Sequence, residues 1–351
     1  MRIGIPRETK TLEGRVALVP AACGDLVRAG HEVFIEAGAG DKSGFPDAAF
    51  EAVGVNILPD AAALYGQAEL VVKVKEPIAG DLQHLRKDHL LFCYLHLAAE
   101  PALTERLLEI GLTGVAFETV EESDGSLPLL APMSNIAGRI GVQGATHLLH
   151  QPQGGRGILL GGLPSTDRGH VVVLGAGAAG GNAARLAAAA GARVTVFDKR
   201  QDRLAEMMAI GANVTALYPY VETVADTVSR ADMVIGAVLV TGARAPHVLT
   251  RQMIRDMPEG SVVVDISVDQ GGCFETTRPT TYADPTYQVD GVTHFAVTNM
   301  PGAVPKTSSH ALSAAILPYV QQMARSDWEA NPALARGVNV RDGDIVHPAL
   351  K

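Results

Sequence analysis

Three glycines that follow an apolar run are the most informative chemical pattern in the chain. Val171–Leu174 is apolar, and Gly175, Gly177 and Gly180 come directly after it. An alanine-rich segment follows, and a second apolar segment then ends on Asp198. This order is typical of dinucleotide binding: a strand, a glycine turn, a helix, and a second strand that ends in an acid. The alternative is a glycine turn that only connects two elements.

Each glycine has its own expected role in such a turn. Gly175 would permit the tight turn, and Gly177 would let the backbone approach a pyrophosphate. Gly180 would let the helix pack closely on the strand. The helix N-terminus, with its free N–H groups, would face the phosphates.

The acid at the end of the second strand indicates which nicotinamide cofactor is bound. Asp198 is placed to bind the ribose hydroxyls of NAD, and its charge repels the 2′-phosphate of NADP. Lys199, Arg200 and Arg203 follow it and could offset that charge. The sequence favours NAD, with NADP as the alternative.

Two cationic segments could bind a carboxylate substrate. Arg15 precedes an apolar run, and a guanidinium can hold a carboxylate through two parallel hydrogen bonds. A solvated surface arginine is the alternative. Lys73 and Lys75 alternate along an apolar strand and so share one face. Lys75 lies at the carboxyl end, where parallel sheets bind ligands, unless it simply points into water.

Two further residues could move protons. His96 follows an apolar strand near its carboxyl end, and histidine can exchange protons with a carbonyl oxygen near neutral pH. A structural histidine is the alternative. Asp269 lies between an apolar strand and a glycine turn. It could transfer protons or hold water and ammonia beside a nicotinamide, or it could cap the turn.

Alternating strand and helix signals must position these residues. The alternation predicts parallel sheets covered on both faces, and therefore an α/β fold with two Rossmann-like domains. Residues 331–351 carry few periodic signals. Strands are expected at 2–6, 31–35, 70–74, 89–94, 113–119, 171–174, 193–197, 213–217, 233–238, 262–266 and 294–298. Helices are expected at 20–29, 61–67, 101–110, 133–150, 178–190 and 308–325.

The segment 121–128 carries acids and glycine and marks a domain boundary. We expect a discontinuous substrate and catalytic domain at 1–128 and 306–351, because the C-terminal helix could pack back on the first domain. An NAD-binding Rossmann domain is expected at 129–305. A Gly- and Pro-rich connection occupies 151–168.

Composition excludes several other classes of protein. The net charge of −9 over 351 residues argues against nucleic-acid binding. Cys23, Cys93 and Cys273 are scattered, so neither a metal site nor a disulfide framework is indicated. The chain has no apolar run long enough for a membrane span and no signal peptide at its start. A cytoplasmic protein is expected.

Ordered segments along nearly the whole chain resemble alanine dehydrogenase. They include MRIGIPRETKTLEGRVALVP, VVKVKEP, LFCYLHLAAE, PLLAPMS, VVVLGAGAAGGNAAR, VVVDISVDQGGCFETTRPTTY and NMPGAVPKTS. The resemblance implies reversible NAD-dependent oxidation of L-alanine to pyruvate and ammonia, a cleft between two domains, and a hexamer. The related transhydrogenase α subunit is the alternative, and a non-catalytic NAD-binding sensor is another. A transhydrogenase α subunit is not expected to carry Arg15, Lys75, His96 and Asp269 together.

The resemblance also assigns roles to individual positions. It makes Arg15 and Lys75 substrate-binding residues and His96 and Asp269 catalytic. The chain departs from the family at Asn135, usually glutamate, and at Ser165, usually glycine. The expected cofactor-binding residues are Ser134, Gly175, Gly177, Ala178, Ala179, Gly180, Asp198, Arg203, Val238, Leu239, Ile266, Ser267, Val268, Asp269, Arg278, Val297, Thr298, Asn299 and Met300.

Overall fold

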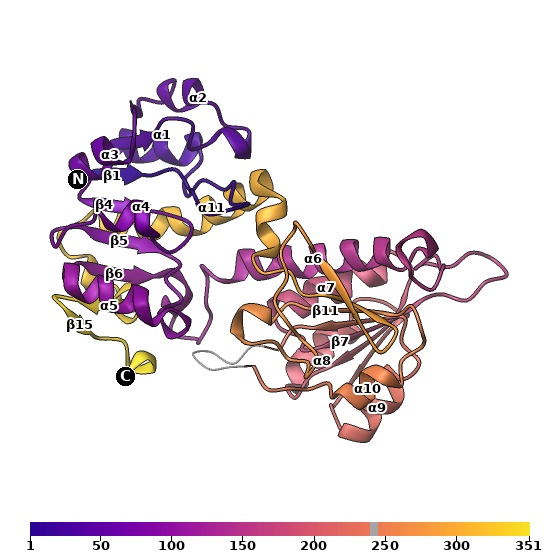
Figure 1. Ribbon diagram of the computed structural model, residues 1–351. Coiled ribbons are helices and arrows are strands. Elements are labelled where there is room, and N and C mark those ends of the chain that lie inside the picture. Colours follow the sequence, from indigo (N-terminus) through magenta and orange to yellow (C-terminus); the bar gives the residue numbers. More distant parts are fainter. Residues whose placement is uncertain (239–244) are drawn as a thin grey trace. The chain divides into compact units, whose positions relative to one another are not determined.

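The computed structural model describes residues 1–238 and 245–351 (Figure 1). Contacts divide the chain into two compact units. Unit 1 comprises Met1–Met133 and Gly302–Lys351, and unit 2 is the continuous segment Ser134–Pro301. The polypeptide therefore leaves unit 1, forms all of unit 2 and then returns to unit 1. Leu239, an expected cofactor residue, lies outside the described residues.

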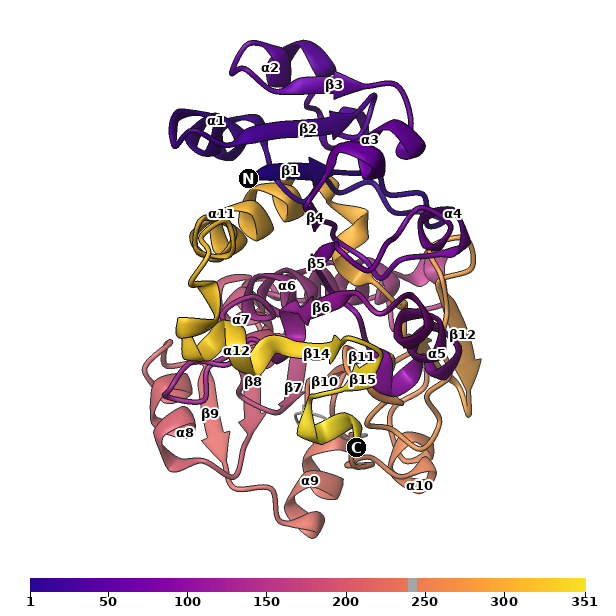
Figure 2. The same cartoon turned by 90° about the vertical axis from the view of Figure 1, so that its left-hand side faces the viewer.

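Unit 1 is built on an eight-stranded sheet with the order β15-β14-β6-β5-β4-β1-β2-β3 (Figure 2). The six strands from the first part of the chain pair in parallel. β14 pairs antiparallel with both β6 and β15. The strands are β1 (Arg2–Ile5), β2 (Glu32–Glu36), β3 (Asn56–Leu58), β4 (Leu70–Val72), β5 (Leu90–Cys93), β6 (Thr113–Ala116), β14 (Val338–Arg341) and β15 (Asp344–Ile345).

Short local signals set the helices of unit 1. Proline occupies the first turn of α1 (Pro20–Arg28), α5 (Pro101–Ile110) and α11 (Pro305–Met323), where its missing N–H costs nothing. Helix α1 packs against α2 (Asp47–Glu51) and α11. The remaining helices are α3 (Ala61–Gln67), α4 (Ala79–Leu82) and α12 (Pro332–Gly337).

The core of unit 1 lies between its sheet and α3 and α5. Leu64 from α3, Leu91 from β5 and Leu107 from α5 are fully buried in one apolar cluster. Gly111 ends α5 in the left-handed conformation, with φ of 74°, which returns the chain to β6.

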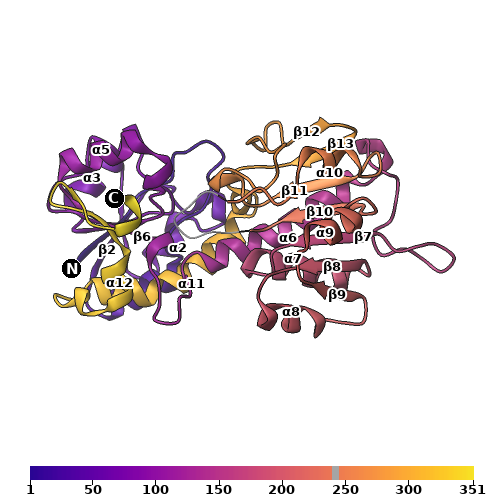
Figure 3. The same cartoon turned by 90° about the horizontal axis from the view of Figure 1, so that it is seen from below.

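Unit 2 is built on a seven-stranded sheet with the order β12-β13-β11-β10-β7-β8-β9 (Figure 3). All neighbouring strands are parallel except β12, which is antiparallel to β13. The strands are β7 (His170–Leu174), β8 (Arg193–Phe197), β9 (Val214–Leu217), β10 (Met233–Gly236), β11 (Val262–Asp265), β12 (Thr286–Val289) and β13 (Val292–Phe295).

The helices of unit 2 pack closely because several contact residues are small. Helix α6 (Ala131–Leu148) approaches α7 (Ala178–Ala189) so tightly that a Cβ on Gly138 would lie 2.1 Å from the Ala179 carbonyl oxygen. Val228 of α9 (Val221–Val228) and Ile254 of α10 (Arg251–Arg255) belong to another buried cluster with β7, β10 and β11. Helix α8 (Gln201–Met208) packs beside α7 and β9.

The predicted α/β fold class is confirmed, and both sheets are mostly parallel. The exceptions are β12, β14 and β15, which are antiparallel. The segment 331–351 carries few periodic signals in the sequence, yet it contains α12, β14 and β15. Its strands are too short to show a clear period, and β14 is held by a distant partner, β6.

One loop residue has an unfavourable backbone conformation. Ser165 lies in the connection between α6 and β7 with φ of 77°, where a Cβ is strained. Its side chain forms no hydrogen bond among the described residues that would offset this strain. Glycine at this position would be free of that strain.

Ser165→Gly should therefore stabilise unit 2 by about 0.5–1 kcal/mol, because relief of the strain outweighs the greater freedom of glycine when unfolded. Thermal unfolding in parallel with the parent protein measures this. The matched control is Ser229→Gly, because Ser229 ends α9 with φ of −59°. That control should lose stability, and a loss in both variants would contradict the strain at Ser165.

Candidate active site

The glycine turn of unit 2 has room for a ligand at one glycine only. Gly175 has φ of 99°, and a Cβ there would lie 2.5 Å from the Ala237 carbonyl oxygen. A Cβ on Gly180 would lie 1.8 Å from the Gly175 carbonyl oxygen. A Cβ on Gly177 meets nothing within 4 Å. Helix α7 begins directly after Gly177, so its first-turn amides can donate to an anion in that open space.

Asp198 connects the end of β8 to this turn. One of its oxygens accepts from the Ala176 amide at 2.7 Å, and the other accepts from the Arg200 amide at 2.8 Å. Arg200 forms an ion pair with Asp202, and Arg203 forms one with Glu206 at 3.0 Å. These two guanidinium groups therefore have carboxylate partners other than Asp198.

A buried carboxylate organises the loop after β11. Asp265 is 2% exposed and accepts hydrogen bonds from the Ser267 amide at 2.9 Å and the Cys273 amide at 2.8 Å. The Thr277 hydroxyl also donates to it. These donors satisfy the oxygens of a carboxylate that is shielded from water. Asp265 thereby fixes both ends of the loop.

Asp269 lies on this loop, in a 3-10 turn at Val268–Gln270. Its side chain is exposed, and it has no hydrogen bond or ion pair within the described part of the chain. The Ser267 carbonyl accepts from the Gln270 amide and closes the turn. The structure therefore gives no support to the turn-capping alternative for Asp269.

Other expected cofactor residues surround the same edge of the sheet. The Ser267 hydroxyl donates to the Val238 carbonyl at 2.8 Å, which joins the segments after β10 and β11. Arg278 lies 4.1 Å from the centroid of the Tyr287 ring. Val268, Val297 and Met300 are buried, whereas Ser134, Ile266, Thr298 and Asn299 are partly exposed.

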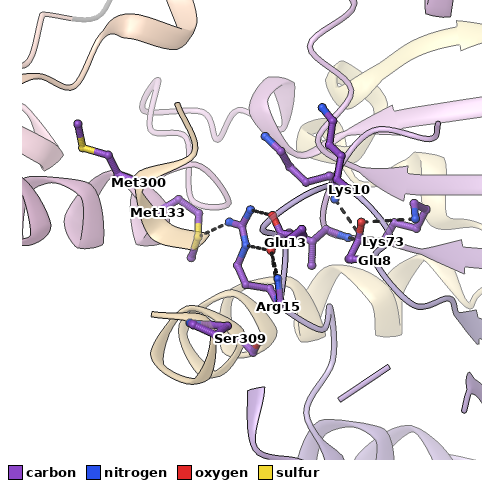
Figure 4. A network of polar contacts seen from close by, with 12 residues as sticks. Glu8, Lys10, Glu13, Arg15, Lys73, Met133, Met300 and Ser309 are labelled. Atoms are coloured by element: carbon purple, nitrogen blue, oxygen red, sulfur yellow. Dashed lines mark hydrogen bonds and ion pairs between the residues drawn. The ribbon is translucent and has the colours of Figure 1, made fainter. Parts of the chain in front are cut away.

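In unit 1, Arg15 is buried rather than solvated. Its side chain is 2% exposed, and Figure 4 shows it against Glu13. Nε donates to Oε1 of Glu13 at 2.7 Å, Nη2 donates to Oε2 at 2.5 Å, and Nη1 lies 3.2 Å from Sδ of Met133. Burial would lower the pKa of Arg15, but Glu13 raises it, so the guanidinium stays charged.

This geometry restricts which edge of Arg15 could bind a carboxylate. Glu13 already occupies the Nε and Nη2 edge of Arg15, so a substrate carboxylate cannot use that edge while the pair persists. The expected alternative of a surface arginine is wrong, because both side chains of the pair are buried.

The two lysines near β4 have different environments, which corrects the expected alternation. β4 ends at Val72, so Lys73 and Lys75 lie beyond it. Lys73 is 1% exposed, and its Nζ lies 3.5 Å from Glu8 (Figure 4). The same Nζ lies 3.2 Å from Asp81. Burial would lower the pKa of Lys73, but these two carboxylates raise it. Lys73 is therefore a structural cation.

Lys75 is the more accessible of the two. Its amide donates to Glu8 at 3.3 Å, and its Nζ lies 4.0 Å from Glu76, which also pairs with Lys10. Burial would raise the pKa of Glu76, but Lys75 and Lys10 lower it. The buried network around Glu8 thus fixes the backbone of Lys75 and leaves its ammonium group only loosely paired.

His96 is held in an uncommon backbone conformation, with φ of 51°. The amides of Leu95 and His96 donate to Glu118 at 3.1 and 2.6 Å, and Nδ1 of His96 lies 3.9 Å from the same carboxylate. The imidazole stacks on Tyr94 with 5.7 Å between ring centroids. Burial raises the pKa of Tyr94, so its hydroxyl stays protonated and donates to Leu129.

The sequence interpretation missed four carboxylates that position the candidate residues. Glu13 pairs with Arg15, Glu8 fixes the Lys75 amide, Glu118 holds His96, and Asp265 holds the Asp269 loop. Only Asp265 and Glu13 carried a usable signal. Asp265 ends an apolar strand, and Glu13 lies two residues before Arg15.

Comparison with known proteins agrees with both halves of the chain. Residues 4–137 match the family model described as alanine dehydrogenase/PNT, N-terminal domain, and residues 141–348 match the C-terminal domain. The chain belongs to the alanine dehydrogenase/PNT family. The resemblance inferred from the sequence is thereby confirmed.

Members of this family with curated names cover the chain from end to end. Alanine dehydrogenase of Halomonas elongata is 48% identical, covering 100% of this chain and 96% of that protein. Alanine dehydrogenase of Mycobacterium tuberculosis is 49% identical, covering 99% and 95%. A solved L-alanine dehydrogenase superposes with a TM-score of 0.96 and 47% identity, covering 100% and 98%.

A transhydrogenase structure from Sinorhizobium meliloti matches less closely, with a TM-score of 0.86 and 25% identity, covering 99% of this chain and 100% of that one. Alanine dehydrogenase is thus favoured over the transhydrogenase alternative. The family and its Rossmann-like fold imply a nicotinamide dinucleotide cofactor. Within the described ranges, no group of His, Cys, Asp and Glu could hold a metal ion, and no helix could cross a membrane.

The Glu13–Arg15 pair gives a test of stability. Glu13→Gln keeps an oxygen that can accept from the Gly14 and Arg15 amides, but it removes the charge opposite a buried guanidinium. Breaking a buried pair from one side costs about 3 kcal/mol, whereas replacing both charges costs less. In thermal unfolding, Glu13→Gln should therefore lose more stability than the double variant Glu13→Gln/Arg15→Met.

The matched control for this test is Asp327→Asn, because Asp327 pairs with Arg325 on the surface at 3.1 Å. That substitution should leave the unfolding temperature nearly unchanged. The single variant Arg15→Met completes the comparison. If the loss of stability in the double variant equalled the sum of the losses in Glu13→Gln and Arg15→Met, the two buried groups would not be energetically coupled.

Proposed function

We propose that this chain catalyses the reversible, NAD-dependent oxidative deamination of L-alanine to pyruvate and ammonia. The observation that carries the proposal is its 48–49% identity, over essentially the whole length, to the two alanine dehydrogenases above. The partner-dependent hydride exchange of a transhydrogenase subunit is the second candidate, and its structural representative is only 25% identical.

NAD is the proposed cofactor, and it would supply a nicotinamide ring that accepts hydride. The open space at Gly177 and the α7 amides would hold the pyrophosphate. Asp198 would bind the adenosine ribose and repel a 2′-phosphate. Arg200 and Arg203 form ion pairs with acids of their own segment, which supports NAD because both guanidinium groups have carboxylate partners besides Asp198.

Arg15 and Lys75 would hold the carboxylate of alanine. Arg15 would use a nitrogen that Glu13 does not occupy, or Glu13 would yield one bond as substrate arrives. Lys75 offers an ammonium group with only a 4.0 Å contact to Glu76. Two cations on separate segments fix both oxygens of a carboxylate and so restrict the direction of the Cα–H bond.

Bound NAD would supply the acceptor for a hydride from Cα of L-alanine. Loss of that hydride, and of one proton from the neutral amine, leaves a neutral imine. Water adds to the imine carbon and gives a carbinolamine. The C–N bond then breaks as the nitrogen takes up a proton and leaves as ammonia, while the hydroxyl loses its proton and the C=O bond of pyruvate forms. His96 and Asp269 would carry the protons of these steps, with His96 held in place by Glu118 and Tyr94.

The roles of the two units follow from this scheme. We infer that residues 1–128 and 306–351 form the substrate and catalytic domain and that residues 129–305 form the NAD-binding domain. A cytoplasmic homohexamer without nucleic-acid or membrane partners remains the expectation from the family. Its test is the mass of the purified protein in solution by light scattering.

The proposed reaction is tested by absorbance at the NADH band after mixing the protein with NAD and L-alanine. His96→Ala should still bind NADH but lose about 100-fold or more in kcat, because it lacks the proposed proton carrier. The matched control is His150→Ala, because His150 is exposed and far along the sequence from every candidate residue. It should retain parental kcat.

Two results would contradict this assignment. Absence of NADH production with L-alanine and every other amino acid tested would favour a transhydrogenase-like subunit or an NAD-binding sensor. A kcat for His96→Ala within about tenfold of the parent would remove His96 from proton transfer.

Asp198→Asn gives a separate test of cofactor choice. Asparagine keeps an oxygen that can accept from the Ala176 amide, but it removes the charge that repels a 2′-phosphate. The ratio of kcat/KM for NAD to that for NADP should fall by about tenfold, the effect of one removed charge repulsion. Asp256→Asn, an exposed change beyond α10, is the control. An unchanged ratio would show that Asp198 does not discriminate between NAD and NADP.

A further inference from the structure

Unit 2 contains a cavity that the proposed reaction does not use. It has a volume of about 770 Å³ and is lined by segments that precede β7, β8, β9 and β10. In parallel strands these segments lie at the amino edge of the sheet, whereas ligands of Rossmann folds bind at the carboxyl edge. We call this cavity the arginine groove, because Arg156, Arg168, Arg193 and Arg230 all line it.

The four guanidinium groups reach the groove from separate parts of the sequence. Arg156 and Arg168 come from the two ends of the Gly- and Pro-rich connection, Arg193 begins β8, and Arg230 lies between α9 and β10. The lining has four arginines against two aspartates, Asp167 and Asp232, so it is locally positive in a chain whose net charge is −9.

Two of these arginines have no counter-charge. Within the described ranges, Arg168 and Arg193 form no ion pair and no side-chain hydrogen bond. Asp167 also lines the groove and pairs with neither. Their donors therefore remain available for an anion, and two guanidinium groups can each bind phosphate or carboxylate oxygens through two bonds.

A buried carboxylate holds one wall of the groove in place. Asp232 is 8% exposed, and its Oδ2 accepts from the His170 amide at 2.7 Å. Its Oδ1 forms an ion pair with Arg156. Arg230 is tied instead to Asp226, one turn earlier on the surface. Arg156 is thus held on the wall of the cavity that the unpaired Arg168 and Arg193 also line.

The lining also limits the chemistry of the ligand. Among the described residues that line the groove none is aromatic, and Ile158 is the single aliphatic one. A nucleobase would therefore find no ring to stack on. We propose that the arginine groove binds a compact polyanion, carrying two or more phosphate or carboxylate groups, at a site separate from the dinucleotide site.

The separation from the dinucleotide site follows from strand length. β7 runs from His170 at the groove to Leu174, and Gly175 comes next. Five residues of strand span about 16 Å, so one phosphate group cannot contact both the groove and the glycine turn. The proposal does not depend on the reaction assigned above, because no groove residue is among the candidate catalytic or cofactor-binding residues.

Isothermal titration calorimetry of the full chain with sodium tripolyphosphate tests this proposal. Citrate in a second titration distinguishes a polycarboxylate from a polyphosphate. The parent protein should show saturable binding of at least one of these anions, also with NADH present. Arg168→Ser/Arg193→Ser should weaken the Kd at least about tenfold through the loss of charge-assisted hydrogen bonds. The Kd of Arg168→Lys/Arg193→Lys should lie between that of the parent and that of Arg168→Ser/Arg193→Ser. Lysine keeps the positive charge but cannot donate two parallel hydrogen bonds as a guanidinium does.

The control is Arg251→Ser/Arg255→Ser, which removes two exposed arginines of unit 2 that both face Asp290. It changes the net charge equally and should leave the Kd within about twofold. Three results would overturn the proposal: no saturable binding by the parent, equal binding by Arg168→Ser/Arg193→Ser, or equal weakening in the control. Loss of oligomers in Arg168→Ser/Arg193→Ser without anion binding by the parent would make the groove a subunit contact instead.

Discussion

In a parallel sheet the carboxyl ends of neighbouring strands meet at one edge, and this constraint determines where each chemical group of the chain lies. In unit 2 it brings the glycine turn, Asp198 and the Asp269 loop to the ends of β7, β8 and β11. In unit 1 it places Lys75 beyond β4 and His96 beyond β5, which is the next strand in the sheet. The opposite edge of unit 2 has its own electrostatic character, with four arginines and no candidate catalytic group.

Charge burial is the second constraint, and the chain meets it in three ways. Arg15 has a bidentate carboxylate beside it, Lys73 lies between two carboxylates, and Asp265 is surrounded by amide and hydroxyl donors. Removing ions from water costs several kcal/mol each, so every such group needs its partners in a fixed place. The partners in turn determine backbone positions, as Glu8 does for the Lys75 amide.

The sequence predicted those features whose signals are local. The glycine turn, α3 and α5 follow from neighbouring residues, and the expected bounds of α3 and α5 agree with the structure. The end of β4 at Val72 was not predictable, because the buried pairing of Lys73 with Glu8 and Asp81 depends on distant segments. Glu118 was missed for the same reason, since it lies in a 3-10 turn after β6 whereas His96 follows β5. The assigned roles of the site residues stay predictions.

The return of the chain to unit 1 has a consequence for how the protein is made. β6 leaves the ribosome early, but its neighbour β14 is translated only after the whole of unit 2. Until then β6 is an open sheet edge, with unpaired N–H and C=O groups that another nascent chain could bind. Unit 2 is continuous and can fold as soon as it emerges, so vectorial synthesis completes the second sheet before the first.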